Sequence, residues 1–507
     1  MAQTVPASEL DEYLRLLELS GRAHGPLFHH SAGSPRTVTG VHLWQARHPL
    51  AGRARSSGLW LEPIDPTLVT AFNSGRPYGI NDGALWAGKG ASAAFSGGAR
   101  VGLGPVTATF HPTVWTSENR AFTLGPLTFP DRSPFAYAWS DRIDWPQRLG
   151  DAAPREFAWG QSSVRVQAGP WTVGFGTENF WLGPAVRNPI LMSSTAAGFP
   201  HLDLGLSRPA GTFLGAVEFR VLWGSLGESA YFDTIPDNDR RLFAGLTAAI
   251  SPRWISGLTL GFARVFYQTW TDTLGVGDFL AIVQPFTKDA IATEEDPEGN
   301  DEADQMLALS ARWRFPEVGF EVYGEWARND HNRNWRDFLL EPDHSQAFLI
   351  GFQKLVPSGP GTIRLRGEWT HLGRSTTFQV RATPTFYFHH LVRQGYTHEG
   401  QLLGAGIGPG SDAQHLAIDR YDGGGRFGAF LERVRYNDDE YYRRFATDRL
   451  REGHNVELAA GLSAYRLLGP VDAGLAVAVR REFNQYYEIG ADATNVTASA
   501  TLRWRWR

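Results

Sequence analysis

The chain contains no cysteine and only three lysines, Lys89, Lys288 and Lys354, among its 507 residues. The absence of cysteine excludes disulfide bonds, thiolate metal sites and cysteine nucleophiles. The formal net charge of −5 gives no cationic field of the kind that attracts nucleic acid. Because lysine is so rare, arginine carries nearly all of the positive charge. Arginine suits bidentate recognition of anionic groups, although a GC-rich genome would produce the same bias.

Long apolar runs are missing as well. No window holds the roughly eighteen uninterrupted apolar residues that a membrane-spanning helix needs, and the mean hydropathy is −0.28. Glycine is abundant, with 56 residues, and aromatic residues make up 13% of the chain, including 18 tryptophans. A membrane-spanning β-barrel has such a composition, because only every second residue of its strands faces lipid.

Apolar and polar residues alternate over many short stretches. In one of them, Val217, Phe219 and Val221 lie on one face, and Glu218 and Arg220 lie on the other. The same alternation recurs at 318–326, 363–369, 471–480 and 502–507. A charged face would cost several kcal/mol per charge in hydrocarbon, so it must face water or a polar lumen, and the apolar face then meets lipid.

Tight Gly/Pro turns alternate with long loops along almost the whole chain. We expect tight turns at 96–99, 169–170, 209–211, 251–252, 316–317, 357–360, 423–425 and 469–470. We expect strands at 57–72, 83–95, 99–111, 156–168, 171–179, 199–207, 212–224, 241–250, 257–268, 303–315, 318–328, 344–355, 361–372, 411–421, 426–436, 453–467, 471–483 and 494–506. This pattern predicts an all-β fold, a transmembrane antiparallel β-barrel of about 18 strands.

The alternation of tight turns and long loops also predicts how the barrel is oriented in the membrane. Bacterial outer-membrane barrels have short periplasmic turns and long extracellular loops, so both termini are expected in the periplasm. A soluble antiparallel protein with one wet face is the alternative. It would need elements that cover its apolar faces, and the sequence predicts only one convincing helix.

That helix lies in the N-terminal segment 1–56, which precedes the barrel unit 57–507. Ser8 is the expected N-cap, and a helix follows over about 8–20 with an apolar stripe at helical spacing. The stripe must be buried, either against the periplasmic rim of the barrel or as a plug in its mouth. We expect Met1 to be an added start residue in front of a processed N-terminus.

Two loop regions carry residue types suited to carbohydrate. Aromatic rings pack on the C–H faces of sugars, whereas arginine, amide and carboxylate groups bind hydroxyls, and bidentate arginine suits uronic acids. The candidate polysaccharide-binding residues are Glu178, Trp181, Arg187, Asn188, His389, Arg393, Tyr396 and Asp412. The competing interpretation is that each of them packs the loops inside the barrel as a structural plug.

The strings around these residues resemble the capsule assembly Wzi family of outer-membrane proteins. The resemblance rests on Glu-Asn-Phe-Trp-x-Gly-Pro-x-x-Arg-Asn at 178–188, Ser-Ser…Gly-Phe-Pro-His at 193–201 and Gly-Gln-x-Leu-Gly…Gly-Pro-Gly-Ser-Asp at 400–412, and it covers roughly 57–507. It implies an eighteen-stranded barrel, a periplasmic helical region, loops that close the barrel and a non-enzymatic, lectin-like retention of capsular polysaccharide. Relatives with a well-developed helical bundle have several helices before the barrel, whereas only one is predicted here.

Two other functions remain open from the sequence: a porin or substrate-specific channel, and a barrel hydrolase or structural part of an envelope complex. His389-His390 and His398-Glu399 lack metal-ligand spacing, and Ser193 and Ser194 have no assignable catalytic partner. We expect no cofactor and no metal. The acidic run 294–304 either holds a divalent cation against lipopolysaccharide phosphates or is a solvated loop. The expected partners are outer-membrane lipid, lipopolysaccharide, surface polysaccharide and other envelope proteins, but no nucleic acid.

Overall fold

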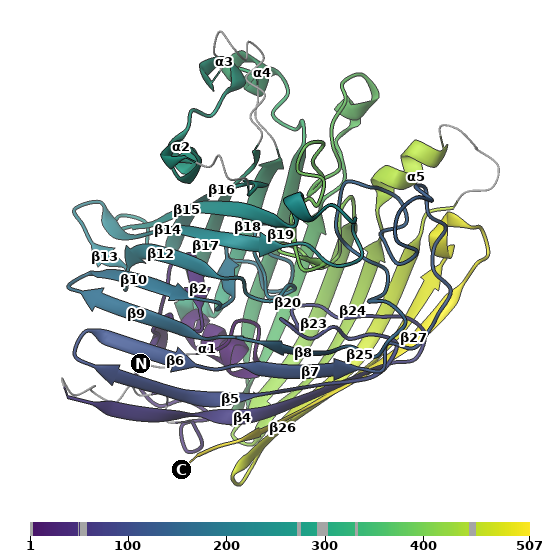
Figure 1. The fold of residues 1–507 in the computed structure, drawn as a ribbon. Helices are drawn as coiled ribbons and strands as arrows, with labels where there is room; N and C mark the ends of the chain where they lie inside the picture. Colours follow the sequence, from purple (N-terminus) through teal and green to yellow (C-terminus); the bar gives the residue numbers. More distant parts are fainter. Residues whose placement is uncertain are drawn as a thin grey trace.

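The computed structural model describes residues 4–48, 50, 58–270, 275–291, 303–329, 333–445 and 453–506. These residues form a closed antiparallel barrel of 18 strands (Figure 1), as the sequence predicts. Three wall strands are interrupted, so each is described by two labels. Strand β27 pairs with β4 and closes the ring.

The wall strands are β4 (Trp60–Asn73), β5 (Gly90–Leu103), β6 (Val106–Phe110) with β7 (Thr113–Ser117), β8 (Arg155–Ala158) with β9 (Ser163–Ala168), β10 (Trp171–Gly176), β12 (His201–Leu206) with β13 (Ala210–Gly211), β14 (Gly215–Gly227), β15 (Arg240–Pro252), β16 (Leu258–Thr269), β17 (Asp304–Phe315), β18 (Phe320–Asn329), β19 (Gln346–Ser358), β20 (Gly361–His371), β23 (Asp412–Asp422), β24 (Gly425–Arg435), β25 (Val456–Leu468), β26 (Val471–Phe483) and β27 (Ala493–Trp504).

The smaller elements lie in the N-terminal segment and the long loops. They are α1 (Glu9–Leu19), β1 (Ala23–His24), β2 (His29–Ser31), β3 (Thr37–Val38), β11 (Phe180–Leu182), α2 (Val276–Phe279), α3 (Lys288–Ile291), α4 (Trp335–Leu340), β21 (Thr397–His398), β22 (Gln401–Leu402) and α5 (Asp438–Phe445). Among the described residues, none of the helices has the length and apolar character needed to cross a membrane.

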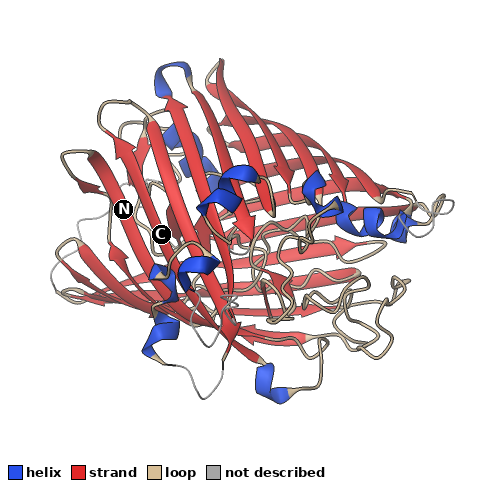
Figure 2. Cartoon of the chain, turned by 90° about the horizontal axis from the view of Figure 1, so that it is seen from above, coloured by secondary structure: helices blue, strands red, loops and turns tan. Residues whose placement is uncertain are grey.

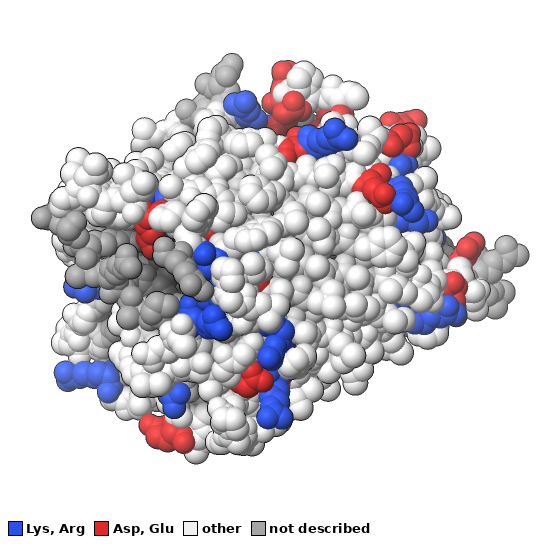
Figure 3. Space-filling view, turned by 90° about the horizontal axis from the view of Figure 1, so that it is seen from below, with Lys and Arg blue, Asp and Glu red and all other residues white. Residues whose placement is uncertain are grey.

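The two faces of the wall differ as the alternation predicts. On β26, the outward side chains of Leu475, Val477 and Val479 are exposed, whereas Asp472 and Arg480 point inward and are buried. Figure 3 shows a broad uncharged area on one side of the molecule, with charged side chains gathered toward its margins. Burying charge inside and presenting apolar side chains outside is the arrangement that lipid requires.

One predicted turn is wrong. Residues 96–99 lie inside β5, and the chain reverses at Gly104–Pro105 instead, so the predicted strands 83–95 and 99–111 have the wrong bounds. The glycines there allow neighbouring strands to approach each other closely. A Cβ atom on Gly98 would lie only 1.8 Å from a carbonyl oxygen of β6. Adjacent glycines therefore indicated a reversal where they in fact mark a packing constraint.

Most other predicted reversals lie within a few residues of the observed ones. The predicted turn at 209–211 overlaps β13 and the one at 251–252 ends β15, and the chain reverses at 212–214 and 253–257. Most of the acidic run 294–304 lies outside the described residues. Its last residue, Asp304, begins β17 and accepts a hydrogen bond from the Tyr267 hydroxyl. Both termini lie at the end of the barrel that carries the tight turns (Figure 1).

The predicted N-terminal helix is present and lies inside the barrel. Ser8 caps α1, accepting a hydrogen bond from the Asp11 amide at 3.3 Å. The apolar stripe of the helix, including Leu10, Leu14 and Leu17, is buried in one cluster with wall residues near the tight turns, among them Leu355, Tyr421, Tyr465 and Leu467. The helix therefore packs against the inner wall and fills the lumen at that end.

Ion pairs to the wall hold the charged faces of α1. Glu12 binds Arg364 and Arg366 of β20, with distances of 2.5 and 2.8 Å, and Arg15 binds Glu321 of β18 at 2.9 Å. Glu18 lies 3.1 Å from Arg312 of β17. The charged inner face that the sequence assigned to a polar lumen is thus used to dock this helix.

We expect the docking of α1 to withstand mild acid. Burial raises the pKa of Glu12, but Arg366 and Arg364 outweigh burial and lower it to about 2. A carboxyl group whose folded pKa is depressed contributes stability that is fully present above its unfolded pKa, which is 4.5 here, and that declines as the pH falls from there through about 2.

Hydrogen exchange of residues 9–19, corrected for intrinsic rates, should therefore show the same protection at pH 8 and at pH 5.5. The Glu12→Gln variant, which cannot ionise at this position, should be less protected at both pH values. A loss of protection in the wild type near pH 5 would contradict the assignment of Glu12 as the docking carboxylate.

Candidate functional site

Residues 177–200, here called the plug loop, run from β10 into the barrel rather than away from it. Glu368 of β20 accepts hydrogen bonds from the backbone amides of Val186 and Asn188, both at 2.8 Å, and of Arg187 at 3.2 Å. The Tyr323 hydroxyl donates to the same carboxylate at 3.0 Å. A buried wall carboxylate therefore satisfies backbone groups of the loop that water would otherwise bind.

Two more wall glutamates hold the same loop. Glu325 of β18 accepts the amides of Ala185 and Ile190 at 3.2 and 3.0 Å. Glu432 of β24 binds the Arg187 guanidinium through Nε at 2.5 Å and Nη2 at 2.9 Å. Bidentate pairing of this kind fixes the position and direction of the arginine.

The plug loop also joins the N-terminal segment. Strands β11 and β2 pair antiparallel, with Phe180 opposite Ser31 and Leu182 opposite His29. Glu218 of β14 accepts the backbone amide of His29 at 2.9 Å, in the manner of Glu368. The N-terminal segment and the plug loop therefore pack together and cross the lumen as one unit.

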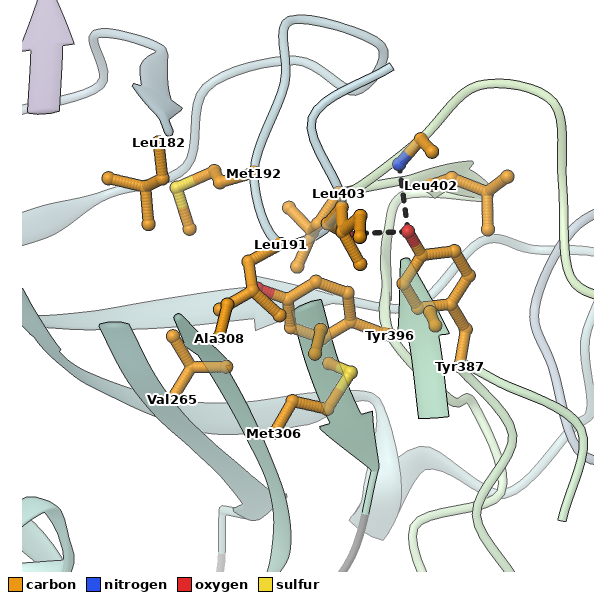
Figure 4. Packing of buried hydrophobic residues seen from close by; sticks show 14 of the residues in the cluster. Leu182, Leu191, Met192, Val265, Met306, Ala308, Tyr387, Tyr396, Leu402 and Leu403 are labelled. Atoms are coloured by element: carbon orange, nitrogen blue, oxygen red, sulfur yellow. Dashed lines mark hydrogen bonds between the residues drawn. The ribbon is translucent and has the colours of Figure 1, made fainter. Parts of the chain in front are cut away.

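An apolar core forms where the plug loop meets the loop between β20 and β23. Leu191 and Met192 pack with Leu402 and Leu403 and with wall side chains such as Met306 (Figure 4). The Tyr387 hydroxyl ties the two loops together. It donates to the Ile190 carbonyl at 2.5 Å and accepts from the Ala405 amide at 2.9 Å. Figure 2 shows loop segments crossing the area that the strands enclose.

The first group of predicted sugar-binding residues lies in this packing. Glu178 is buried and pairs with Arg165, and the Trp181 ring is only 3% exposed, with its Nε1 donating to the Ala185 carbonyl at 3.1 Å. Arg187 and Asn188 are held by Glu432 and Glu368 as described above. All four residues lie in the plug loop, where Glu178, Trp181 and Asn188 are buried and the Arg187 side chain is 19% exposed, and each is engaged with protein groups.

The second group is spread more widely. His389 is buried and accepts the Val392 amide at 3.0 Å, Tyr396 lies fully buried in the apolar core, and Asp412 begins β23, where it accepts a hydrogen bond from Trp369 Nε1 at 2.8 Å. Arg393 differs, because its side chain is 47% exposed while it pairs with Asp141. Sugar binding by all eight residues stays a prediction, and Arg393 is the one with a widely exposed side chain.

A cavity of about 260 Å³, here called the loop cavity, opens among the long loops. Its walls come from the loops that follow β4, β7, β10, β20, β24 and β26. Nine aromatic residues line it: Tyr78, Trp86, Phe122, Tyr137, Trp139, Trp145, Tyr436, Tyr486 and Tyr487. The sequence analysis missed this site, because its aromatic residues come from separate loops. The only signal was the excess of aromatic residues in long connections.

The charged side chains that line the loop cavity differ in whether they form ion pairs. Arg76 lines it but binds Glu457 at 2.8 Å and Glu482 at 2.9 Å. Asp82 forms no ion pair in the part of the chain that the structure describes. The surrounding loops enclose Asp82, and this enclosure raises its pKa to about 7, although the carboxylate is exposed to the cavity itself. Asp82 also borders an interior cavity of about 200 Å³ beside Arg187.

One cluster has the composition of a metal site. Ligand atoms of Glu178, His201 and Asp203 lie within 4.8 Å of one another. Arg165 pairs with both carboxylates, and Arg220 also pairs with Asp203. Because two guanidinium groups already bind these oxygens, the cluster is better suited to holding the plug than to a divalent cation.

Comparisons with known proteins agree with this architecture. The family model of the capsule assembly protein Wzi matches residues 73–439. A solved structure from Escherichia coli, described as Wzi, an outer-membrane protein involved in group 1 capsule assembly and a carbohydrate-binding β-barrel, is 12% identical, covers 100% of both chains and has a TM-score of 0.65. At this identity the likeness shows a shared fold.

Two other solved structures are more distant. OccK2 (OpdF) from Pseudomonas aeruginosa is 11% identical over 87% of this chain and 97% of its own, with a TM-score of 0.42. OccAB2 from Acinetobacter baumannii is 10% identical over 88% of this chain and 98% of its own, also at 0.42. No curated protein matches the chain. Because the family model spans well over half of the chain, from β4 to α5, this protein belongs to the capsule assembly protein Wzi family.

Proposed function

We propose that this protein is a non-enzymatic outer-membrane barrel that binds surface polysaccharide at its loop cavity and takes part in capsule assembly. The observation that carries the proposal is the loop cavity, in which nine aromatic residues surround a space of about 260 Å³. Aromatic faces bind the C–H faces of sugar rings. Membership of the Wzi family and the description of the E. coli structure as a carbohydrate-binding barrel support the same function.

The proposed orientation places the tight turns, both termini and the N-terminal segment 1–56 in the periplasm, and the long loops of the barrel unit 57–507 outside the cell. The outward apolar side chains then contact membrane lipid and lipopolysaccharide, and the loop cavity faces the capsule. In this proposal the buried candidates, such as Trp181 and Asn188, and the partly buried Arg187 act by holding the plug loop in place. Arg393 is the candidate that contacts polysaccharide directly.

The filled lumen argues against a porin. An open channel needs a continuous aqueous path, whereas helix α1, the plug loop and the apolar core around Tyr387 and Tyr396 occupy the interior. The wall carboxylates that would line a selective pore are engaged with backbone amides and arginines of the plug.

Binding of detergent-solubilised protein to an array of bacterial surface polysaccharides tests the proposal. The half-buried rings of Trp139 and Tyr486 line the loop cavity, so Trp139→Ala and Tyr486→Ala should each lower the affinity about tenfold, the loss of roughly 1.4 kcal/mol expected for one stacking contact. Trp254→Ala is the matched control, because Trp254 is 62% exposed in a tight turn at the opposite end. Equal affinity in all three variants would overturn the assignment of the cavity as the sugar site.

A further inference from the structure

We propose that the loop cavity accepts sugar residues without a carboxylate, neutral or amino sugars, and discriminates against uronic acids. This inference rests on the proposed carbohydrate binding at the cavity. It reverses the expectation, drawn from the arginine-rich composition, that bidentate arginines recognise uronates.

The first argument is the charge balance of the lining. The charged side chains that line the loop cavity are one cation, Arg76, and two carboxylates, Asp82 and Glu482. Arg76 pairs with Glu482 and with Glu457 behind it, and its guanidinium lies 5.3 Å from the ring centre of Tyr436. Two carboxylates, those of Glu482 and Glu457, therefore already balance its positive charge before any ligand enters.

The second argument concerns the arginines next to the cavity. Arg187 is bound by Glu432 and also donates to the Tyr78 hydroxyl at 3.2 Å. Arg480 pairs with Glu432 and Glu457, and its guanidinium lies 3.4 Å from the centre of the Tyr78 ring. Neither arginine offers a free bidentate face, so a uronate that entered the cavity would lose water without gaining a cation.

The third argument is the carboxylate of Asp82. It forms no ion pair among the described residues, and it is exposed to the cavity, so it can accept a hydrogen bond from a sugar hydroxyl or N–H group. The same charge repels a second carboxylate. The faces of the aromatic rings favour C–H groups and ammonium groups, whereas their negative π-systems disfavour an anion.

A matched pair of ligands tests the inference. Methyl glucoside and methyl glucuronide differ only in the oxidation of C6, and their affinities can be compared by calorimetry on detergent-solubilised protein at pH 8. Asp82 is ionised at this pH, because its pKa is about 7. We expect the glucoside to bind at least tenfold more tightly than the glucuronide.

The Asp82→Asn variant keeps the shape of the side chain and removes its charge. It should reduce the preference to about threefold or less, mainly by improving binding of the glucuronide. Asp237→Asn, an exposed carboxylate in the loop between β14 and β15, is the control and should keep the full preference.

Equal or tighter binding of the glucuronide by the wild type would overturn the inference and leave the proposed function intact. The same holds if Asp82→Asn keeps the wild-type preference. If neither glycoside binds, and Trp139→Ala leaves polysaccharide binding unchanged, both the inference and the cavity assignment fail.

Discussion

Replacement of Glu368 by alanine should release the plug loop and turn a silent barrel into a conducting one. Its carboxylate, which is buried, accepts three backbone amides of the loop and the hydroxyl of Tyr323. The variant leaves these donors buried without a partner, at an expected cost of roughly 3–5 kcal/mol for breaking a buried charged network. The neighbouring carboxylate of Glu325 holds Ala185 and Ile190, so Glu325→Ala should act in the same direction.

Planar-bilayer recordings measure the effect. The wild type should give no large stable conductance steps, because plug loop and helix fill the lumen, whereas Glu368→Ala should give steps or prolonged flickering. Limited proteolysis should cut the plug loop only in the variant. Glu62→Ala is the control, because Glu62 also lies on a wall strand but is 58% exposed and pairs with Arg100. A Glu368→Ala barrel that stays silent and resists protease would show that the carboxylate does not hold the plug.

The second large effect is expected from Tyr13→Ala in helix α1. Tyr13 is fully buried and stacks on Trp44 with a centroid distance of 3.9 Å and an interplanar angle of 16°. Its hydroxyl lies 3.1 Å from His42 Nδ1 and accepts the Trp44 amide at 3.1 Å. Truncation of a buried aromatic side chain costs about 3–5 kcal/mol, which exceeds what a short docked segment is expected to tolerate.

Hydrogen exchange of residues 9–19 and proteolytic cleavage between 20 and 48 report whether the N-terminal segment has left the lumen. Both should increase strongly in Tyr13→Ala and weakly in Tyr13→Phe, which loses only the hydroxyl contacts. Tyr442→Ala, at a ring that is 44% exposed in α5, should change neither. If the segment stays protected in Tyr13→Ala, its docking depends on the ion pairs of Glu12 and Arg15 rather than on this aromatic stack.

The success of the strand predictions has a local cause. Lipid on one side and polar groups on the other impose a period of two on each strand, and this period is readable from a few consecutive residues. Pairs such as β26 and β27 follow the predicted ranges closely. The prediction failed at 96–99, because glycine permits both a turn and a close approach of neighbouring strands, and only the neighbours distinguish the two.

The residues singled out for sugar binding illustrate a different limit. Trp181, Arg187 and Tyr396 have the right chemistry, but the sequence does not state whether a loop folds inward or outward. The partners of Arg187, Glu432 and Glu368, lie far along the chain and on other strands. A residue type predicts what a side chain can bind, whereas its actual partner depends on which segments the closed barrel brings together.

The sequence by itself therefore determined the barrel, its alternating turns and loops, the capped N-terminal helix and the family resemblance, since each is encoded by short-range patterns. Tertiary structure decided what fills the lumen, which arginines are already paired, and where an aromatic cavity forms. Closure of the ring brings the loop cavity together from Trp86, Tyr137, Tyr436 and Tyr486 on separate loops. Short-range sequence patterns do not predict such contacts, because the contacts depend on the packing of distant segments against one another.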